Sequence, residues 1–301
     1  MTKRLFKGLA AVVLGLVGLL VFRILTLPPV TGSEPAWSPD GATVLFSSDR
    51  EGARAIYSLR LGNGEAIRVT AEEETAHYPA WSPDGTRVAY ASRGDGSWRL
   101  CLLELSTSYR SCLIETGAAN PMRPTWSPDG SRIAVAVTED GNRDILVIPV
   151  SGGQPEQIAA HPSEEDHPAW SPDGSSIAFS SERDGDKELY RYDLDSGELE
   201  RLTHDPSYDG FPAWSADGRT LAFVSTRDGF RAIHLLDLET GGVTRVTEDN
   251  GRAYYPSWSP DEARIVFMSN RDGDDALFTV APAGGAALRV TPRVEGGTDP
   301  A

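Results

Sequence analysis

The chain contains one pentapeptide, Trp-Ser-Pro-Asp-Gly, in six copies at almost constant spacing. Four copies are identical and two have one change each; they start at Trp37, Trp81, Trp126, Trp170, Trp214 (Trp-Ser-Ala-Asp-Gly) and Trp258 (Trp-Ser-Pro-Asp-Glu). The intervals are 44, 45, 44, 44 and 44 residues. Repeats of ~40–45 residues that hold four short strands are typical of propeller blades. The repeat therefore predicts an all-β protein, a six-bladed β-propeller of four-stranded blades.

The pentapeptide suits a tight turn between two strands. Ser, Pro and Asp fit the first three positions of a type I turn, and Gly supplies the positive φ that follows. The Trp is a large apolar plate suited to packing between blades. In the sixth copy Glu262 replaces the Gly, and a side chain in the left-handed region costs roughly 1–2 kcal/mol. We expect a distorted or re-routed turn at Glu262, whereas the loss of proline at Ala216 should matter little.

Each turn is followed by an apolar triplet, such as Val44-Leu45-Phe46 or Ile177-Ala178-Phe179. Continuous apolar runs predict strands that are covered on both faces. Later in the repeat come an Arg-Asp-Gly turn, as at Arg183, and a closing Leu/Val-Thr, so four strands fill the period. The first repeat begins with its own Trp strand and the sixth ends with its own Val-Thr strand. Each blade is therefore expected to consist of consecutive residues, with the ring closed by packing of blade six against blade one.

The combined pattern resembles the TolB-type, WD40-like (PD40) propeller repeat. It consists of x-Pro-x-Trp-Ser-Pro-Asp-Gly, an apolar triplet, Ser-x-Arg-Asp-Gly and a final Leu/Val-Thr, and it covers nearly everything outside the N-terminal segment. The resemblance implies the propeller fold. It implies less about function, because the family includes envelope scaffolds, sensor domains, peptidase-gating propellers and a few lyases. TolB carries an α/β domain before its propeller that residues 1–33 are too short to supply, so TolB's partners are not carried over.

The N-terminal segment differs from the repeats. Lys3, Arg4 and Lys7 precede fifteen uncharged, mostly apolar residues, 8–22, and Arg23 follows them. With snorkelling side chains at both ends this segment can span a membrane as a signal anchor; the alternative is a cleaved secretory signal. In both cases the charge asymmetry places the propeller outside the cytoplasm. We expect residues 1–27 to form a basic stub and transmembrane helix, 28–33 a linker, 34–292 the propeller and 293–301 a flexible tail.

The charge excludes one class of partner. The whole chain has a net charge of −16, and residues 33–301 carry 24 basic and 44 acidic residues, a net charge of −20. Such a surface repels nucleic acid and anionic headgroups. We expect no nucleic-acid partner and a monomeric propeller.

Both cysteines, Cys101 and Cys112, fall in the second repeat, on its third and fourth strands. A two-residue loop near Ser106 would place them opposite each other, within disulfide reach, and a three-residue loop would put them out of register. Export of the propeller favours a disulfide. The alternative is a pair of reduced core thiols.

The candidate binding residues lie just before the x-Pro-x-Trp segments. The first strand of a propeller blade lines the axis, and the chain entering it forms one mouth of the central channel. Positions one to five ahead of the prolines are rich in His, Tyr and charge and differ between blades, whereas structural positions of a repeat should look alike. Besides Glu34, they supply the predicted partner-binding set: His77, Tyr78, Arg123, Asp166, His167, Asp209, Phe211, Tyr254 and Tyr255. Aromatic residues with Arg and Asp are typical of binding hot spots; the alternative is that they only fill a narrow axis.

Metal and catalytic chemistry have little support. His77, Asp166, His167 and Asp209 are acceptable metal ligands. Only two histidines, His77 and His167, fall at the predicted channel mouth, so we expect no metal site and no cofactor. The serines of the pentapeptide are turn residues, and the Gly-x-Ser-x-Gly nucleophile motif is missing from the sequence. No catalytic residue is predicted.

The leading hypothesis is a membrane-anchored, extracytoplasmic propeller that binds a protein or peptide partner in the cell envelope without catalysis. The alternative is a metal-dependent, carbohydrate-active enzyme similar to polysaccharide lyases that uses the same mouth. A third hypothesis is a structural spacer whose mouth is filled by its own side chains.

Overall fold

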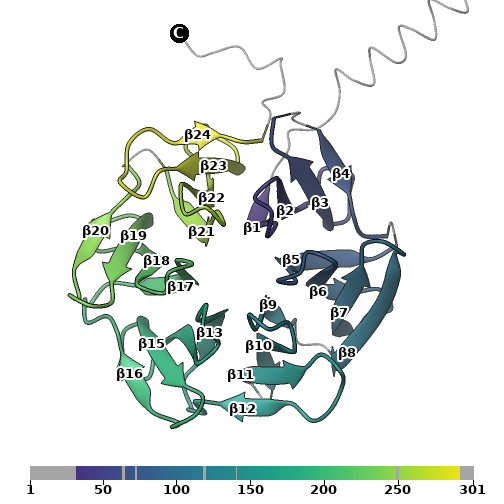
Figure 1. Cartoon of the computed structure of the whole chain (residues 1–301), viewed down its shortest axis with the longest axis horizontal. Coiled ribbons are helices and arrows are strands. Elements are labelled where there is room, and N and C mark those ends of the chain that lie inside the picture. The colour runs from purple at the N-terminus through teal and green to yellow at the C-terminus, as the bar shows by residue number, and fades with distance from the viewer. Residues whose placement is uncertain are drawn as a thin grey trace, which may run out of the picture.

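The computed structural model is a ring of six four-stranded antiparallel sheets around a central axis (Figure 1). It describes residues 32–62, 65–71, 73–117, 120–139, 141–248 and 251–291. Strand order follows chain order in every sheet, so each blade consists of consecutive residues, as predicted. The expected transmembrane helix over 1–27 and the tail over 293–301 lie outside the described residues. Within the described ranges, no helix has the length and apolar character needed to cross a bilayer.

The strands of the first three blades are β1 (Ser33–Trp37), β2 (Thr43–Ser48), β3 (Ala55–Arg60), β4 (Ala66–Arg68), β5 (Thr75–Trp81), β6 (Arg87–Arg93), β7 (Trp98–Glu104), β8 (Tyr109–Gly117), β9 (Met122–Trp126), β10 (Arg132–Glu139), β11 (Asn142–Pro149) and β12 (Glu156–Ile158). Those of the last three are β13 (Glu165–Trp170), β14 (Ser176–Ser181), β15 (Glu188–Asp193), β16 (Leu199–Arg201), β17 (Asp209–Trp214), β18 (Thr220–Ser225), β19 (Ala232–Asp237), β20 (Val243–Arg245), β21 (Ala253–Trp258), β22 (Ile265–Ser269), β23 (Ala276–Val280) and β24 (Leu288–Arg289). The first strand of each blade lies nearest the axis and the fourth lies at the outer rim (Figure 1).

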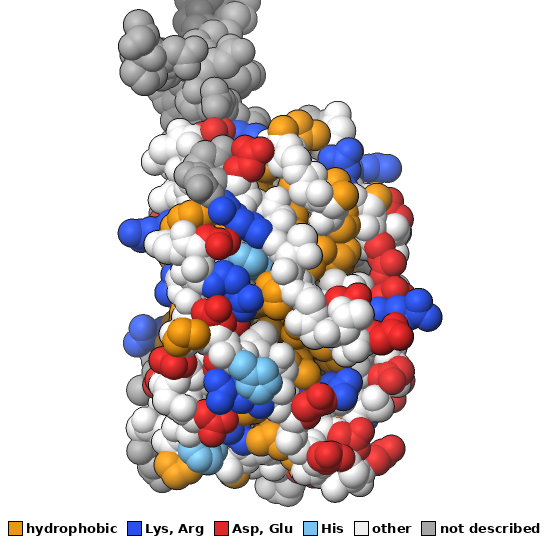
Figure 2. Space-filling view, turned by 90° about the vertical axis from the view of Figure 1, so that its left-hand side faces the viewer, with side chains coloured by type: hydrophobic (Ala, Val, Ile, Leu, Met, Phe, Trp, Pro, Cys, Tyr) orange, Lys and Arg blue, Asp and Glu red, His pale blue; other side chains and the backbone are white. Residues whose placement is uncertain are grey.

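Acidic side chains are spread over the side of the ring, with basic ones between them (Figure 2).

The core lies between blades, on both faces of the second strands. All three residues of every apolar triplet are 0% exposed, from Val44, Leu45 and Phe46 in β2 to Ile265, Val266 and Phe267 in β22. This confirms the prediction from the continuous apolar runs, because only face-to-face packing of neighbouring blades covers both sides of a strand.

The repeated Trp connects successive blades. Trp126 of blade three packs against Ala89 and Leu100 of blade two, and its indole Nε1 donates to the carbonyl of Ala80 at 3.1 Å. Trp214 and Trp258 make the same hydrogen bond to the blade before them, each at 3.1 Å. The predicted role of the Trp as an inter-blade plate is confirmed.

Packing also closes the ring. Trp37, Val44 and Phe46 of blade one form one apolar cluster with Val266 and Leu277 of blade six. No strand is exchanged between these blades among the described residues. Closure therefore depends on buried apolar contact, together with a backbone hydrogen bond from the N–H of Gly32 to the carbonyl of Asp275 at 3.3 Å, and not on an exchanged strand.

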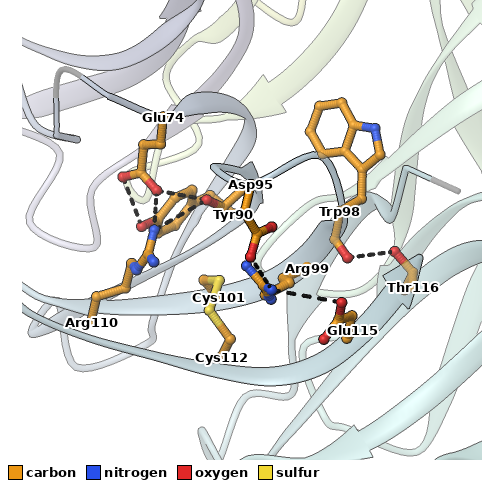
Figure 3. Close-up of a disulfide and its surroundings, with 11 residues drawn as sticks. Glu74, Tyr90, Asp95, Trp98, Arg99, Cys101, Arg110, Cys112, Glu115 and Thr116 are labelled. Atoms are coloured by element: carbon orange, nitrogen blue, oxygen red, sulfur yellow. Dashed lines mark hydrogen bonds and ion pairs between the residues drawn. A yellow bond between two sulfur atoms is a disulfide. The ribbon is translucent and has the colours of Figure 1, made fainter. Parts of the chain in front are cut away.

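The two cysteines face each other on the hairpin of β7 and β8, and the structure joins them by a disulfide (Figure 3). The loop between the two strands covers residues 105–108 and is therefore longer than the two-residue loop considered from the sequence. Both loops have the same midpoint. The register that pairs Cys101 with Cys112 is therefore retained.

The expected distortion at Glu262 is wrong. Glu262 has φ +56°, in the region occupied by the glycines of the other five turns, such as Gly41 at +69°. Its N–H donates to Ser259 at 2.9 Å, as the N–H of Gly41 does to Ser38. The turn keeps its path, and Glu262 takes the left-handed conformation despite its side chain.

The neighbouring turn explains how Glu262 is accommodated. At the other five junctions, the left-handed glycine faces the turn proline of the preceding blade; a Cβ on Gly218, for example, would lie 3.2 Å from Pro172. Glu262 instead faces the turn that has Ala216 in place of proline. Its Oε1 accepts a hydrogen bond from the N–H of Asp217 at 2.9 Å. The two departures from the repeat therefore fall at one junction, where the missing proline ring leaves room for the glutamate.

We predict that Ala216→Pro and Glu262→Gly are energetically coupled by about 1–2 kcal/mol. In the native background the proline ring competes with the Glu262 side chain, so Ala216→Pro should lower the free energy of unfolding. In the Glu262→Gly background, Ala216→Pro recreates the contact between proline and glycine found at the other five junctions and should be neutral or stabilising. Denaturant unfolding of the four proteins measures the coupling. Additive effects, within about 0.5 kcal/mol, would show that the two sites are independent.

Candidate functional site

The residue before the first-strand proline has the same unusual conformation in all six blades. We call these residues the axial ring; its members have φ between 54° and 60° and are Glu34, Tyr78, Arg123, His167, Phe211 and Tyr255. The strand register slips at this point in every blade, which makes a β-bulge. A residue before proline is normally extended, and left-handed geometry costs a side chain roughly 1–2 kcal/mol. The fold sustains this strain six times around one axis.

The axial ring borders a cavity of about 290 Å³ on the propeller axis. The residues that follow the ring along each first strand form its walls; they are mainly prolines and small residues, and they include Pro35, Ala36, Pro79, Ala80, Pro124, Thr125, Pro168, Ala169, Pro212, Ala213, Pro256 and Ser257. Proline has no N–H, so these walls offer few backbone donors. The chemistry of the cavity therefore depends on the side chains of the axial ring.

Arg123 reaches across the ring onto aromatic side chains of three other blades. Its guanidinium carbon lies 4.0 Å from the ring centroid of Tyr255, 4.6 Å from that of Phe211 and 5.5 Å from that of Tyr78. These are cation–π distances, which stabilise a cation with little water around it. Its Nη2 is buried and has no hydrogen-bond partner among the residues that the structure describes.

His167 is an uncharged member of the axial ring. Its ring stacks on Phe211 with centroids 3.9 Å apart, and its Nδ1 lies 2.9 Å from Ser180 Oγ. Because the Ser180 hydroxyl donates to the carbonyl of Asp166 at 3.1 Å, Nδ1–H is assigned as the donor to Ser180. Burial, together with the charge of Arg123, holds the pKa of His167 well below its usual 6.5. His167 is therefore neutral at pH 7.

Glu34 is the acidic member of the axial ring and has its own partners. It accepts hydrogen bonds from Ser47 Oγ at 2.5 Å and from the N–H of Tyr78 at 2.8 Å. Burial acts to raise the pKa of Glu34, but His77 and these two donors outweigh it and leave the pKa below its usual value. The Glu34 carboxylate is therefore charged, and it already accepts hydrogen bonds from Ser47 and Tyr78.

The structure places only part of the predicted set at the cavity. Tyr78, Arg123, His167, Phe211 and Tyr255 line it. The other four predicted residues, His77, Asp166, Asp209 and Tyr254, do not line it within the described part of the chain. They lie one or two positions earlier in the strand, before the bulge.

Asp166 is held between two cations. Its Oδ2 accepts hydrogen bonds from Arg143 of blade three at 2.6 Å and from Lys187 of its own blade at 3.2 Å. Its side chain is 5% exposed. Asp166 therefore connects two blades, which is a structural role.

Asp209 likewise forms a buried ion pair. Its Oδ2 accepts a hydrogen bond from Arg227 Nη2 at 2.8 Å, and its side chain is fully buried. Burial raises the pKa of Asp209 to about 6, against the opposing effects of Ser225 and Arg227. Glu165 and Arg183 form the equivalent pair in blade four, at 2.9 Å.

His77 and Tyr254 lie on the side of the axial ring where the first strands begin. The imidazole of His77 has its Nδ1 3.9 Å from Glu34 Oε1 and packs edge-on against Trp98, with centroids 5.4 Å apart. Arg231 stacks over Tyr254 at 5.0 Å and over Tyr208 at 4.3 Å. These contacts form an aromatic and basic rim around the axis.

Sequence reasoning missed a set of cations at this rim. Four blades place one at the same repeat position, four residues after the start of the second turn; they are Arg54, Arg143, Lys187 and Arg231. Three of them reach first-strand carboxylates, Arg54 at 4.0 Å from Glu34 and the other two on Asp166. The signal is present in the sequence as a basic residue that returns with a period of about 44 residues.

No group of three or more His, Cys, Asp or Glu side chains in the described ranges is arranged to hold a metal ion. Of the residues considered as ligands, Asp166 and Asp209 are held by Arg and Lys, and His167 is stacked on Phe211.

Comparison with known proteins agrees with the fold. The family described as the TolB beta propeller domain matches residues 17–118, 75–209 and 206–300. No curated protein matches the chain in sequence. Solved structures similar to it include TolB from Acinetobacter baumannii, with 24% identity and a TM-score of 0.70 over 87% of this chain and 63% of that one. A putative TolB from Agrobacterium tumefaciens has 27% identity and a TM-score of 0.65 over 76% and 85%.

An oligogalacturonate lyase from Vibrio parahaemolyticus is also similar, with 16% identity and a TM-score of 0.56 over 85% of this chain and 92% of that one. At this identity the likeness shows the fold alone. The chain spans 63% of the length of the Acinetobacter TolB, so whatever that whole protein does is not established for this one by the match. The family match covers most of the chain, and the six blades, their consecutive strands and the repeated turn agree with it: the chain belongs to the TolB β-propeller family.

Proposed function

We propose that this protein is a non-catalytic module that binds a protein or peptide partner at the axial ring. One observation carries the proposal: six side chains of five residue types meet at the axis, each in a strained left-handed conformation. Strain of this kind is tolerated where the surrounding structure enforces it and is frequent at binding sites. The aromatic and arginine content of the ring is that of a binding hot spot.

We further propose that the propeller lies outside the cytoplasm and is attached by residues 1–27. The basic Lys3, Arg4 and Lys7 ahead of the apolar residues 8–22 support this topology. The partner is then a protein of the cell envelope, bound by a monomeric propeller. Recovery of the protein in the soluble fraction after membranes are washed at alkaline pH would contradict the anchor.

A crosslinking experiment tests the proposed surface. Tyr254→p-benzoylphenylalanine places a photoreactive group at the rim beside the axial ring, and Ile67→p-benzoylphenylalanine places it on β4, where Ile67 is 60% exposed at the outer edge. Irradiation of the cell envelope should give a defined protein adduct from position 254 that position 67 does not give.

The same adduct should disappear when Arg123→Ala and Tyr255→Ala are introduced together, because these residues form the closest cation–π contact of the ring. Circular dichroism of the double variant checks that the propeller is still folded. An adduct that persists in the folded double variant, or identical adducts from both crosslinker positions, would reject the axial ring as the recognition surface.

A further inference from the structure

We propose that the axial cavity recognises a carboxylate group of a peptide and that Arg123 is the group that binds it. This inference rests on the proposed function, since it names the chemistry of the ligand at the same site. It starts from Arg123, the basic member of the axial ring.

The three aromatic rings hold the guanidinium of Arg123 but leave hydrogen-bonding capacity unused. A guanidinium has five N–H donors, whereas contacts at 4.0, 4.6 and 5.5 Å to ring centroids engage its charge and not its N–H groups. Nη2 is buried, and no acceptor for it lies in the described part of the chain. Among the described residues no carboxylate pairs with Arg123. A buried donor without a partner costs about 1–3 kcal/mol. The Arg123 side chain as a whole is only half-buried on the cavity wall, so a ligand acceptor that draws Nη2 toward the cavity gains from this site.

The other ionisable members of the axial ring do not neutralise Arg123. The carboxylate of Glu34 is occupied by Ser47 and by the backbone of Tyr78, and it faces His77 and Arg54 on the rim. His167 is buried and stacked on Phe211, and the pKa of Tyr78 is raised to about 12 by burial and by the charge of Glu34. At neutral pH the cavity therefore holds one carboxylate, Glu34, which already accepts two hydrogen bonds, and one cation that has no carboxylate partner among the described residues, Arg123.

The size and walls of the cavity limit which ligands can reach the Arg123 guanidinium. Its volume of about 290 Å³ is at the small end of ligand pockets, and its walls are mainly proline and small side chains. This space suits one or two residues of an extended segment. Arginine binds a carboxylate through two parallel N–H···O bonds, and these are strong where water is excluded. The matching ligand is a peptide's terminal carboxylate or an Asp or Glu side chain.

Two matched peptides test the assignment. The full chain in detergent is titrated by calorimetry with Ac-Ala-Ala-Ala-OH and with its amide, Ac-Ala-Ala-Ala-NH₂, which differ only in the carboxylate. We expect the free acid to bind about tenfold or more tightly. It should also shift the side-chain Nε–H resonance of Arg123 in arginine-labelled protein. Ac-Ala-Asp-Ala-NH₂ and inorganic phosphate, as further arms, distinguish a terminal from a side-chain carboxylate and from a general anion.

Arg231→Gln is the control for Arg123→Gln. Arg231 also stacks on two aromatic rings, those of Tyr208 and Tyr254, but it does not line the cavity. We expect Arg123→Gln to abolish the preference for the free acid and Arg231→Gln to retain it. If Arg123→Gln fails to fold, two measurements on the native protein still test the proposal: the difference in affinity between the acid and the amide, and the shift of the Arg123 resonance.

Equal binding of acid and amide, an absence of binding by both, or phosphate binding as tightly as the peptide acid would overturn the carboxylate assignment. These results leave the proposed function standing if the crosslinked envelope partner is still lost from the Arg123→Ala, Tyr255→Ala variant. If that partner persists in the variant, the proposed surface fails as well. The two experiments thus separate a wrong ligand chemistry from a wrong site.

Discussion

Replacing Asp166 by alanine is expected to lower the free energy of unfolding by about 3 kcal/mol. The carboxylate lies between Arg143 of blade three and Lys187 of blade four and is 5% exposed. Its removal leaves two largely buried cations with only the half-exposed carboxylates of Glu164 and Glu182 as partners, and they repel each other across the blade junction. Chemical denaturation of the purified protein measures the loss.

Glu164→Gln is the matched control, because Glu164 contacts the same arginine from the surface. Its carboxylate lies 3.2 Å from Arg143 but is 48% exposed. Exposed ion pairs contribute little, so we expect a change below about 0.5 kcal/mol. Similar stabilities for Asp166→Ala and the native protein would contradict the structural role and return Asp166 to the candidate binding residues.

Removing the disulfide by Cys101→Ala together with Cys112→Ala is expected to lower the free energy of unfolding by about 3 kcal/mol. The two residues are 11 positions apart, and closing a loop of this length restricts the unfolded chain. Two ion pairs flank the bond, Arg110 with Glu74 on one side and Arg99 with Asp95 on the other, and they remain in the variant (Figure 3). A thermal melt of the double variant should show a transition several degrees lower.

The native protein in the presence of a reductant provides the control for this change. It should melt at the temperature of the double variant, and the double variant should not respond to the reductant. Intact mass with and without reduction should differ by two hydrogen atoms. An unchanged mass would mean that the thiols are already reduced, and equal melting temperatures in all samples would mean that the bond does not stabilise the propeller.

The repeat carried enough information for the architecture because each of its features acts locally. The turn is set by Ser-Pro-Asp-Gly, the second strand by its apolar triplet and the blade boundary by the Trp. Each of these holds in the structure. Glu262 is the exception: the residue type argued for a changed turn, but the space left by Ala216 on the adjacent blade, and the hydrogen bond to Asp217, keep the turn as it is in the other blades.

The candidate site was predicted as a region but not residue by residue. Positions one to five before each proline were treated alike, although the β-bulge brings only the last of them to the cavity. Tyr78 and Tyr255 therefore line the axis, whereas their neighbours His77 and Tyr254 lie at the rim. A bulge inserts one residue and changes which side chains face the axis, and the sequence has no separate signal for it beyond the proline.

The sequence by itself determined the six blades, their consecutive strands and the segment of each blade that reaches the axis, because a repeated pattern of turns and apolar runs acts within about 44 residues. Only the tertiary structure decided which side chains meet. Arg123 lies against Tyr78, Phe211 and Tyr255, which belong to three other blades, and Asp166 joins blade three to blade four. Closure of the ring brings these residues together across long stretches of chain, and contacts of that kind depend on the packed positions of all six blades.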